Sequence, residues 1–216
     1  MWDPTGVAAR TTFVWGLKRS GIHLVVNWLY ANLGGAVKNE LVAEGLHPQL
    51  RDGFCDRDSG VAFYNNCGRF NSRQLELGDL MPEDFDLAAS RHAATIFGIE
   101  DCALRFATRT YGLADSVNVL VLRDPLNNLA SRLEAAKTRP ALFRVDVAYI
   151  DLFESYCAEF LRRSNHLPCK TVVNYNRFVG DRAYRDLLAE ELGGANLDVV
   201  SEVSHYGGGS SFTSDN

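Results

Sequence analysis

The chain has 216 residues, of which 46% are hydrophobic and 23% are charged, so it can bury a core of single-domain size. Its formal net charge of −5 excludes an overall attraction to nucleic acid or to an anionic membrane surface. No apolar run is long enough to span a bilayer, and residues 1–10 lack the pattern of a signal peptide. Five cysteines without a Cys-x-x-Cys pair disfavour a disulfide framework and a zinc site. We therefore expect one cytoplasmic domain over residues 1–216 with no resident metal.

Strands and helices are predicted to alternate along the chain. Apolar runs predict strands at residues 11–16, 61–64, 94–99, 116–122 and 171–173. Helices are predicted at residues 22–33, at 126–137, from a cap at Asp146 to residue 161, and from a cap at Asp181 to Gly193 and Gly194. Residues 38–60 are interpreted as loop with at most one helical turn, and residues 71–91 show no clear period. The alternation predicts an α/β fold with three layers, α/β/α, and a mostly parallel central sheet.

The spacing of apolar residues predicts which helix faces are buried. In the helix at 22–33 the predicted face consists of Leu24, Val25, Trp28 and Leu29. In the helix after Asp146 it consists of Tyr149, Ile150, Phe153, Tyr156, Cys157, Phe160 and Leu161. We expect both faces to pack against the sheet.

A basic segment joins the first predicted strand to the first predicted helix. It is Gly-Leu-Lys-Arg-Ser-Gly-Ile-His, residues 16–23. An α/β sheet places phosphate-binding loops at such a junction, because free N–H groups at a helix N-terminus bind anions. Lys18 and Arg19 add positive charge, Ser20 adds a hydroxyl, and the two glycines let the backbone approach a ligand. The alternative is a plain strand–helix turn with a basic surface.

The segment is not a Walker A loop, although its glycines have the Walker spacing. The Walker motif continues with Lys and Ser or Thr, whereas Ile22 and His23 follow the second glycine here. The segment therefore lacks both the Lys that reaches a terminal phosphate and the hydroxyl that holds Mg²⁺. This pattern disfavours nucleoside triphosphate chemistry and predicts anion binding without a metal ion.

A second basic motif follows the most apolar predicted strand. Arg123 comes directly after that strand, Pro125 starts the next helix, and Ser131 lies two turns further on. Ligands of open α/β sheets bind at the carboxyl ends of the strands, so Arg123 and Ser131 are expected to face one anion. In the alternative interpretation, Arg123 and Asp124 form a local ion pair that caps the helix.

The two motifs together resemble the cofactor-binding motifs of the sulfotransferase family, which takes a sulfuryl group from 3′-phosphoadenosine 5′-phosphosulfate (PAPS). The family's 5′-phosphosulfate loop has a basic residue followed by Ser-Gly-Thr-Thr. Arg19 stands at the basic position, and Ile22 and His23 replace the two threonines. A bacterial branch of sulfotransferase-like proteins has a similar Arg-Ser-Gly-x-His opening. The family's 3′-phosphate motif has Arg-x-Pro and a Ser eight positions after the Arg, which Arg123 and Ser131 match.

The resemblance implies a sulfotransferase-like domain that uses PAPS, releases 3′-phosphoadenosine 5′-phosphate (PAP) and requires no metal. It implies that Arg123 and Ser131 hold the 3′-phosphate, and that Arg19 stabilises charge on the leaving 5′-phosphate. The 5′-phosphosulfate loop would consist of Lys18, Arg19, Ser20, Gly21, Ile22 and His23. The acceptor would be a hydroxyl or amine of a small molecule or a glycan, and the sequence carries no code for it.

Sulfuryl transfer also needs a base that takes the acceptor's proton. In relatives the base is a His or a Glu after a middle strand, and Glu100 and Asp101 follow the predicted strand at 94–99. Glu100 is the first candidate, Asp101 the second, and His23, beside the loop, the third. Both acidic residues have an alternative role as the N-cap of a helix at 102–110, and His23 as an ordinary first-turn residue.

Two further segments resemble family features. Tyr175 follows the strand at 171–173, where relatives have a Tyr that contacts adenine, and core packing is its alternative role. The tail contains Gly208, Gly209 and Ser210, whose N–H groups are candidates for wrapping the 3′-phosphate, and a disordered end is the alternative. Two rival functions remain open: a P-loop kinase or nucleotide phosphotransferase, and a non-catalytic nucleotide-binding protein on the same scaffold.

Overall fold

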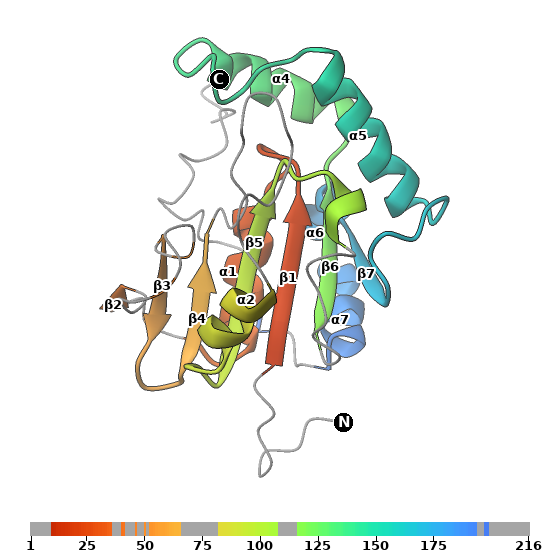
Figure 1. The fold of residues 1–216 in the computed structure, drawn as a ribbon. Coiled ribbons are helices and arrows are strands. Elements are labelled where there is room, and N and C mark those ends of the chain that lie inside the picture. The colour runs from red at the N-terminus through yellow and green to blue at the C-terminus, as the bar shows by residue number, and fades with distance from the viewer. Residues whose placement is uncertain are drawn as a thin grey trace.

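The computed structural model describes residues 10–35, 40–41, 46, 50, 52–65, 82–107, 116–193 and 197–198 (Figure 1). In this part of the chain, seven strands form one sheet in the order β2-β3-β4-β5-β1-β6-β7. The strands are β1 (Arg10–Gly16), β2 (Glu40–Leu41), β3 (Gly53–Asp56), β4 (Val61–Tyr64), β5 (Ala94–Glu100), β6 (Val117–Leu122) and β7 (Lys170–Asn174). The helices are α1 (Ile22–Asn32), α2 (Pro82–Ala89), the 3₁₀ helix η2 (Leu104–Phe106), α4 (Pro125–Ala136), α5 (Val147–Phe160), α6 (Tyr175–Gly180) and α7 (Arg182–Glu191).

The predicted fold class is confirmed. Strands β4, β5, β1, β6 and β7 are parallel, and β3 is antiparallel to both β4 and β2. Each of the five predicted strands is present, with ends that differ by at most one residue. The two predicted caps are also present: the Asp146 side chain accepts from the Tyr149 N–H, and the Asp181 side chain accepts from the Tyr184 N–H. A cap depends on a few consecutive residues, which explains why it could be read from the sequence.

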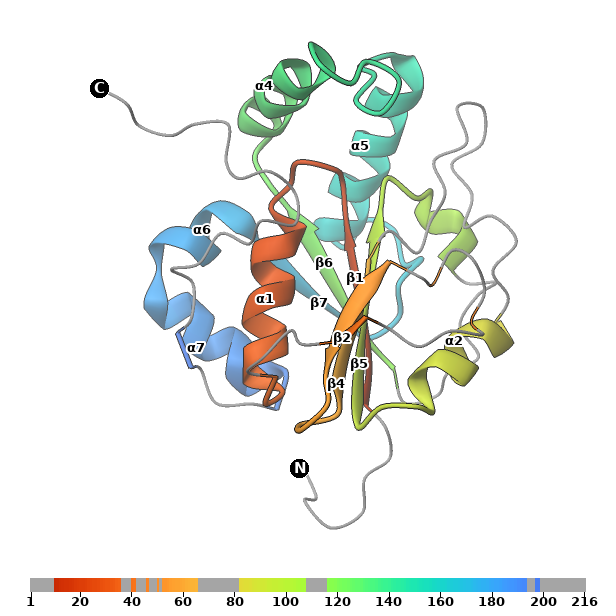
Figure 2. The same cartoon turned by 90° about the vertical axis from the view of Figure 1, so that its left-hand side faces the viewer.

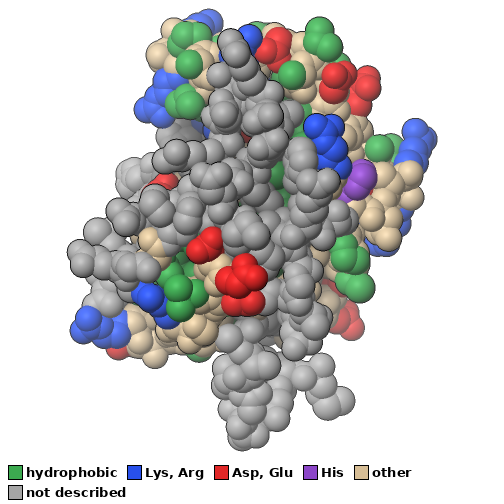
Figure 3. Space-filling view, in the orientation of Figure 1, with side chains coloured by type: hydrophobic (Ala, Val, Ile, Leu, Met, Phe, Trp, Pro, Cys, Tyr) green, Lys and Arg blue, Asp and Glu red, His purple; other side chains and the backbone are tan. Residues whose placement is uncertain are grey.

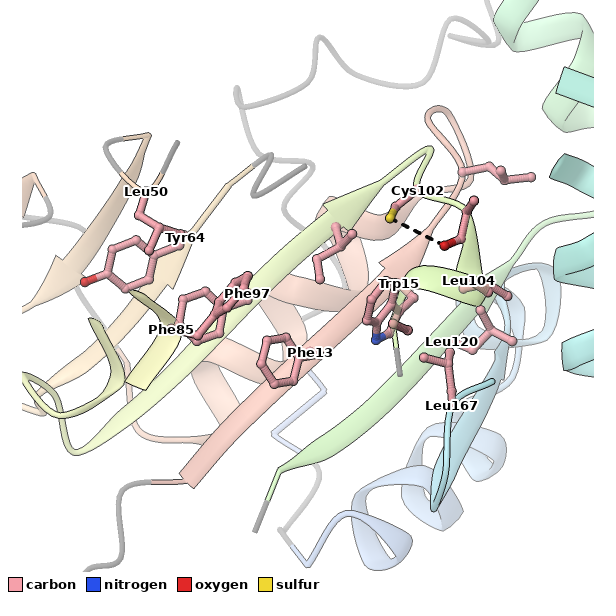
Figure 4. Packing of buried hydrophobic residues seen from close by; sticks show 14 of the residues in the cluster. Phe13, Trp15, Leu50, Tyr64, Phe85, Phe97, Cys102, Leu104, Leu120 and Leu167 are labelled. Carbon is pink, nitrogen blue, oxygen red and sulfur yellow. Dashed lines mark hydrogen bonds between the residues drawn. The ribbon is translucent and has the colours of Figure 1, made fainter. Parts of the chain in front are cut away.

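Helices cover both faces of the sheet, as Figure 2 shows, with α1, α6 and α7 on one face and α2 on the other. Two separate apolar cores result. One joins α1, α6 and α7 to the sheet through Val25, Trp28, Phe178 and Leu188, among others. The opposite core joins α2 and α5 to the sheet. In it, the rings of Phe13 and Phe97 stack at 5.2 Å, and the Phe85 ring from α2 meets both edge-on (Figure 4).

Several predictions about local structure are wrong. Residues 38–60, expected to be loop, contain β2 and β3, which are only two and four residues long, too short for a clear apolar period. Helix α2 lies within 71–91, where no period was apparent, because its buried face consists only of Phe85, Ala88 and Ala89. Helix α6 was not predicted. The face of α5 is rotated from the predicted one, since Ile150 and Leu161 are exposed. Its buried residues are Tyr149, Leu152, Tyr156 and Glu159.

The strand order creates a switch point between β1 and β6. These strands are neighbours, yet α1 after β1 packs on one face and α5, which follows β6 through α4, packs on the other. The connections therefore diverge at the carboxyl ends of β1 and β6, where ligands of open α/β sheets bind. Helix α4 lies beyond this edge in both ribbon views (Figures 1 and 2). Among the described residues no helix has the length and apolarity to cross a membrane.

Candidate functional site

The loop between β1 and α1 has the backbone geometry of an anion-binding turn. Arg19 and Gly21 lie in the left-handed region, with φ of 71° and 87°. Gly21 is the N-cap of α1, and no side chain caps the helix. Because the first N–H groups of a helix have no carbonyl one turn earlier, this end of α1 presents donors and a positive dipole. A non-glycine residue in the left-handed region costs about 1–2 kcal/mol, and Arg19 holds that conformation at this turn.

Ser20 adds an independent sign of a ligand. Its side chain is fully buried, and its hydroxyl oxygen has no hydrogen-bond partner within the described part of the chain. A Cβ added to Gly16 would lie 2.8 Å from that oxygen, so the hydroxyl sits over the end of β1. A buried polar atom left without a partner is destabilising by about 1–3 kcal/mol. The loop therefore carries unused hydrogen-bond capacity beside a helix N-terminus.

The two basic motifs meet in space although they are about a hundred residues apart in the chain. The Arg19 Nε donates to the Ser131 Oγ at 3.0 Å, and an Arg123 guanidinium nitrogen donates to the Arg19 carbonyl at 3.3 Å. Burial lowers the pKa of Arg19, and the charge of Arg123 lowers this pKa further, while Glu100 acts in the opposite direction. Two cations this close repel each other unless an anion lies between them. Because the whole chain has a net charge of −5, an anion site needs positive charge concentrated locally, and Arg19 and Arg123 supply it here.

Tyr175, the first residue of α6 after β7, packs against both basic motifs. The Arg123 guanidinium lies over its ring at 5.4 Å from the centroid, and the ring packs directly on Gly21. Figure 3 shows that, on the face it presents, Lys and Arg side chains form separate groups among acidic and apolar ones. Tyr175 thus contacts both basic motifs, Gly21 of the loop after β1 and Arg123 after β6.

Replacing Gly21 with Ala should strongly destabilise the fold. A Cβ at this position would lie 1.9 Å from the Tyr175 ring, and φ of 87° disfavours any residue with a side chain. We expect the free energy of unfolding in urea to fall by on the order of 3 kcal/mol, from the strained backbone and the displaced ring. Gly180→Ala is the control, because nothing lies within 4 Å of its added Cβ. Equal stabilities for the two variants would show that the Tyr175 contact is not rigid.

Glu100 lies at the carboxyl end of β5, directly beside Gly16 at the end of β1. Its side chain is only 9% exposed, and its Oε1 lies 3.9 Å from the His23 Nε2. Burial, followed by the neighbouring Asp101 carboxylate, raises the pKa of Glu100 to about 7, against the charges of Lys18, Arg132 and Arg19. A carboxyl group with this pKa exchanges protons readily near neutral pH, which suits a general base. His23 therefore lies within ion-pair distance of this carboxyl group, although 3.9 Å is longer than a hydrogen bond.

Asp101 has a different environment from Glu100. Its side chain is fully buried and accepts two hydrogen bonds from Arg132, at 2.9 and 3.1 Å, and one from the Lys18 N–H at 2.9 Å. These three bonds join the carboxylate to Arg132 and to the backbone of the loop. The N-cap alternative for both acidic residues is wrong within the described residues. The short helix η2 begins at Leu104 with Ala103 as its N-cap and no side-chain cap.

The alternative interpretation, a local ion pair of Arg123 and Asp124 that caps the helix, is confirmed for the cap by Asp124 but not for Arg123. Asp124 does cap α4, where its side chain accepts from the Asn127 N–H. Arg123 instead turns toward the loop and Tyr175. The helix cap and the basic residue of the site therefore coexist in adjacent positions.

The structure adds residues that the sequence interpretation did not assign. Arg132 is buried beside Ser131, and Tyr149 of α5 donates to the Asn128 Oδ1. Helical spacing puts Asn128, Ser131 and Arg132 on one face of α4, which was a usable signal. No local pattern pairs Arg132 with Asp101. The tail residues Gly208, Gly209 and Ser210 lie outside the described residues.

Within the described ranges, no three His, Cys, Asp or Glu side chains are grouped so that they could hold a metal ion. No protein-family model matches this chain, and no curated protein matches it.

Proposed function

We propose that this protein is a PAPS-dependent sulfotransferase. One observation carries the proposal: the loop after β1 and the Arg-x-Pro motif after β6 meet at the switch point, joined by the bond from Arg19 to Ser131. A resemblance spread over two distant segments gains weight when both segments contact one another. The uncapped N-terminus of α1 and the buried Ser20 hydroxyl support an anionic ligand at the same place.

In this proposal the role of each residue follows from the group that it faces: the 3′-phosphate, the 5′-phosphate or the acceptor. Arg123 and Ser131 hold the 3′-phosphate, with Tyr175 placed to contact adenine. Lys18, Arg19 and the N–H groups of residues 21–23 hold the 5′-phosphate. The transfer forms an S–O bond to an acceptor hydroxyl, or an S–N bond to an acceptor amine, and breaks the S–O bond to the 5′-phosphate, which leaves as part of PAP. Glu100 takes the acceptor's proton, and Arg19 stabilises the charge that develops on the leaving oxygen.

PAP is expected to bind and to stabilise the fold. A ligand at a hundred times its dissociation constant adds about 2.7 kcal/mol to the free energy of unfolding, which a thermal melt detects readily. The comparison is between PAP and adenosine 5′-phosphate, which lacks the 3′-phosphate that Arg123 would hold. A melt of folded protein with millimolar PAP and no change in midpoint would refute the assignment.

A P-loop kinase is the first rival function, because the two glycines of the loop have the Walker spacing. The residues after Gly21 are Ile22 and His23, so the loop lacks both the Lys and the hydroxyl of that class. Transfer of ³⁵S from labelled PAPS to an acceptor should therefore be unaffected by EDTA. Loss of activity in EDTA with recovery on adding Mg²⁺, together with tighter binding of ATP·Mg²⁺ than of PAP, would favour the kinase.

A non-catalytic nucleotide-binding protein is the second rival, because Ile22 and His23 replace the family's two threonines. The pKa of Glu100, raised to about 7 mainly by burial, supports the enzyme, because strongly shifted carboxyl pKa values cluster at catalytic sites. The acceptor is a hydroxyl or amine of a small molecule or glycan, and the protein acts in the cytoplasm. A screen of acceptors with labelled PAPS distinguishes enzyme from binder.

A further inference from the structure

A buried ion pair lies directly behind the loop. Arg132 of α4 and Asp101 after β5 are 1% and 0% exposed in their side chains, and two hydrogen bonds of 2.9 and 3.1 Å join them. The third guanidinium nitrogen of Arg132 donates to the Arg144 carbonyl at 3.0 Å, and the guanidinium lies over the Tyr149 ring. Each nitrogen of this guanidinium therefore donates a hydrogen bond to another part of the fold.

Asp101 of this pair is hydrogen-bonded to the backbone of the loop. The Asp101 Oδ1 accepts from the Lys18 N–H at 2.9 Å, and the Asp101 N–H donates to the Gly16 carbonyl at 3.1 Å. The Asn128 side chain donates to the Lys18 carbonyl at 3.4 Å. Both peptide groups of Lys18 are thus fixed by side chains that lie far away in the chain. The next residue is Arg19, in its left-handed conformation.

A buried ion pair is weak evidence of stabilisation, because desolvating two charges offsets most of their attraction. Here one carboxylate oxygen is shared between the partner cation and a loop N–H. We propose that Asp101 and Arg132 are positioning residues that hold the loop in its anion-binding conformation before the nucleotide arrives. The part of this inference that concerns PAP rests on the proposed function. The part that concerns the loop stands on the free protein alone.

The chain offers a matched control pair at the opposite edge of the sheet. Glu159 of α5 and Lys170 at the start of β7 lie 2.6 Å apart, with side chains 0% and 4% exposed. The Glu159 carboxylate also accepts from the N–H groups of His166 and Leu167. It is as buried and as fully bonded as Asp101. Since β7 is parallel to β6, its first residue lies at the edge away from the loop.

The test compares Asp101→Ala with Glu159→Ala, and the milder Asp101→Asn with Glu159→Gln. Hydrogen exchange of the peptide covering residues 17–22 is measured without ligand, and PAP affinity is measured by calorimetry on folded protein. All variants should melt at lower temperature than the wild type. Of the two alanine variants, only Asp101→Ala should expose the loop amides to exchange and weaken PAP binding, on the order of tenfold, the scale of one charge-assisted hydrogen bond. Asp101→Asn should fall between, because its side-chain oxygen can still accept from the Lys18 N–H.

The outcomes separate this inference from the proposed function. Loop exchange that rises in the Asp101 variants and not in the Glu159 variants supports a positioning role. Unchanged loop exchange in the Asp101 variants overturns it, as does an equal rise in both pairs. If the wild type binds PAP and the Asp101 variants bind it equally well, the inference also fails. If the wild type does not bind PAP, the proposed function fails, and loop exchange alone decides the positioning role.

Discussion

Replacing Arg19 with alanine is expected to lower kcat for sulfuryl transfer by on the order of 10²–10³, because donors aimed at developing charge contribute on this scale. Arg19 lies in the turn between β1 and α1, where, in the proposed reaction, negative charge grows on the leaving oxygen as the S–O bond breaks. The affinity of Arg19→Ala for PAP should change less than its kcat, since in the proposed complex PAP already carries the full charge and is also held by the loop N–H groups. Steady-state kinetics with labelled PAPS, beside calorimetric PAP affinities, measures both quantities.

Arg123→Ala is the matched comparison for Arg19→Ala. The 3′-phosphate does not change during the reaction, so losing Arg123 should weaken PAP binding and raise KM for PAPS while kcat stays near the wild-type value. Arg19→Lys should keep part of the activity, because a Lys charge can serve the same oxygen without the fork of donors. Normal turnover by Arg19→Ala at saturating PAPS would mean that the reaction centre lies elsewhere.

Replacing Glu100 with Gln should lower kcat by on the order of 10²–10⁴, the usual contribution of a positioned general base. The amide keeps the size and the polarity of the side chain but cannot take up a proton. PAP affinity should change little, because Glu100 faces the acceptor in this assignment. His23→Gln is the comparison, since the two side chains are neighbours. A larger loss for His23→Gln than for Glu100→Gln would transfer the role of base to His23.

The pH dependence follows from the raised pKa of Glu100, which is about 7 in the free protein. A general base works in its deprotonated form, so kcat/KM should fall as the pH drops below about 7 and should level off above it. The phosphates of bound PAPS add negative charge near Glu100. The pKa seen in the pH profile of kcat should therefore be higher than the pKa seen in the profile of kcat/KM. The acid limb should disappear in Glu100→Gln. An unchanged limb in that variant would assign it to another group.

The sequence by itself determined where both halves of the site lie. Buried parallel strands are continuous apolar runs, so β1 and β6 could be recognised together with the basic motifs that follow them. The caps at Asp146 and Asp181 could also be predicted, because a cap is a contact between residues three apart. The acidic residues Glu100 and Asp101 could be located because they come directly at the end of the apolar run that forms β5. These features depend on neighbours in the chain.

The tertiary structure decided which residues meet and what environment each one has. Arg19 meets Ser131 across 112 positions, and Asp101 meets Arg132 across 31, so no local pattern contains either pair. Glu100 and Asp101 are adjacent in the chain, yet one carboxyl group is left to titrate near neutral pH while the other is bound by a buried guanidinium. The difference arises because burial and distant partners set a pKa and fix a carboxylate, and only the packed fold supplies them.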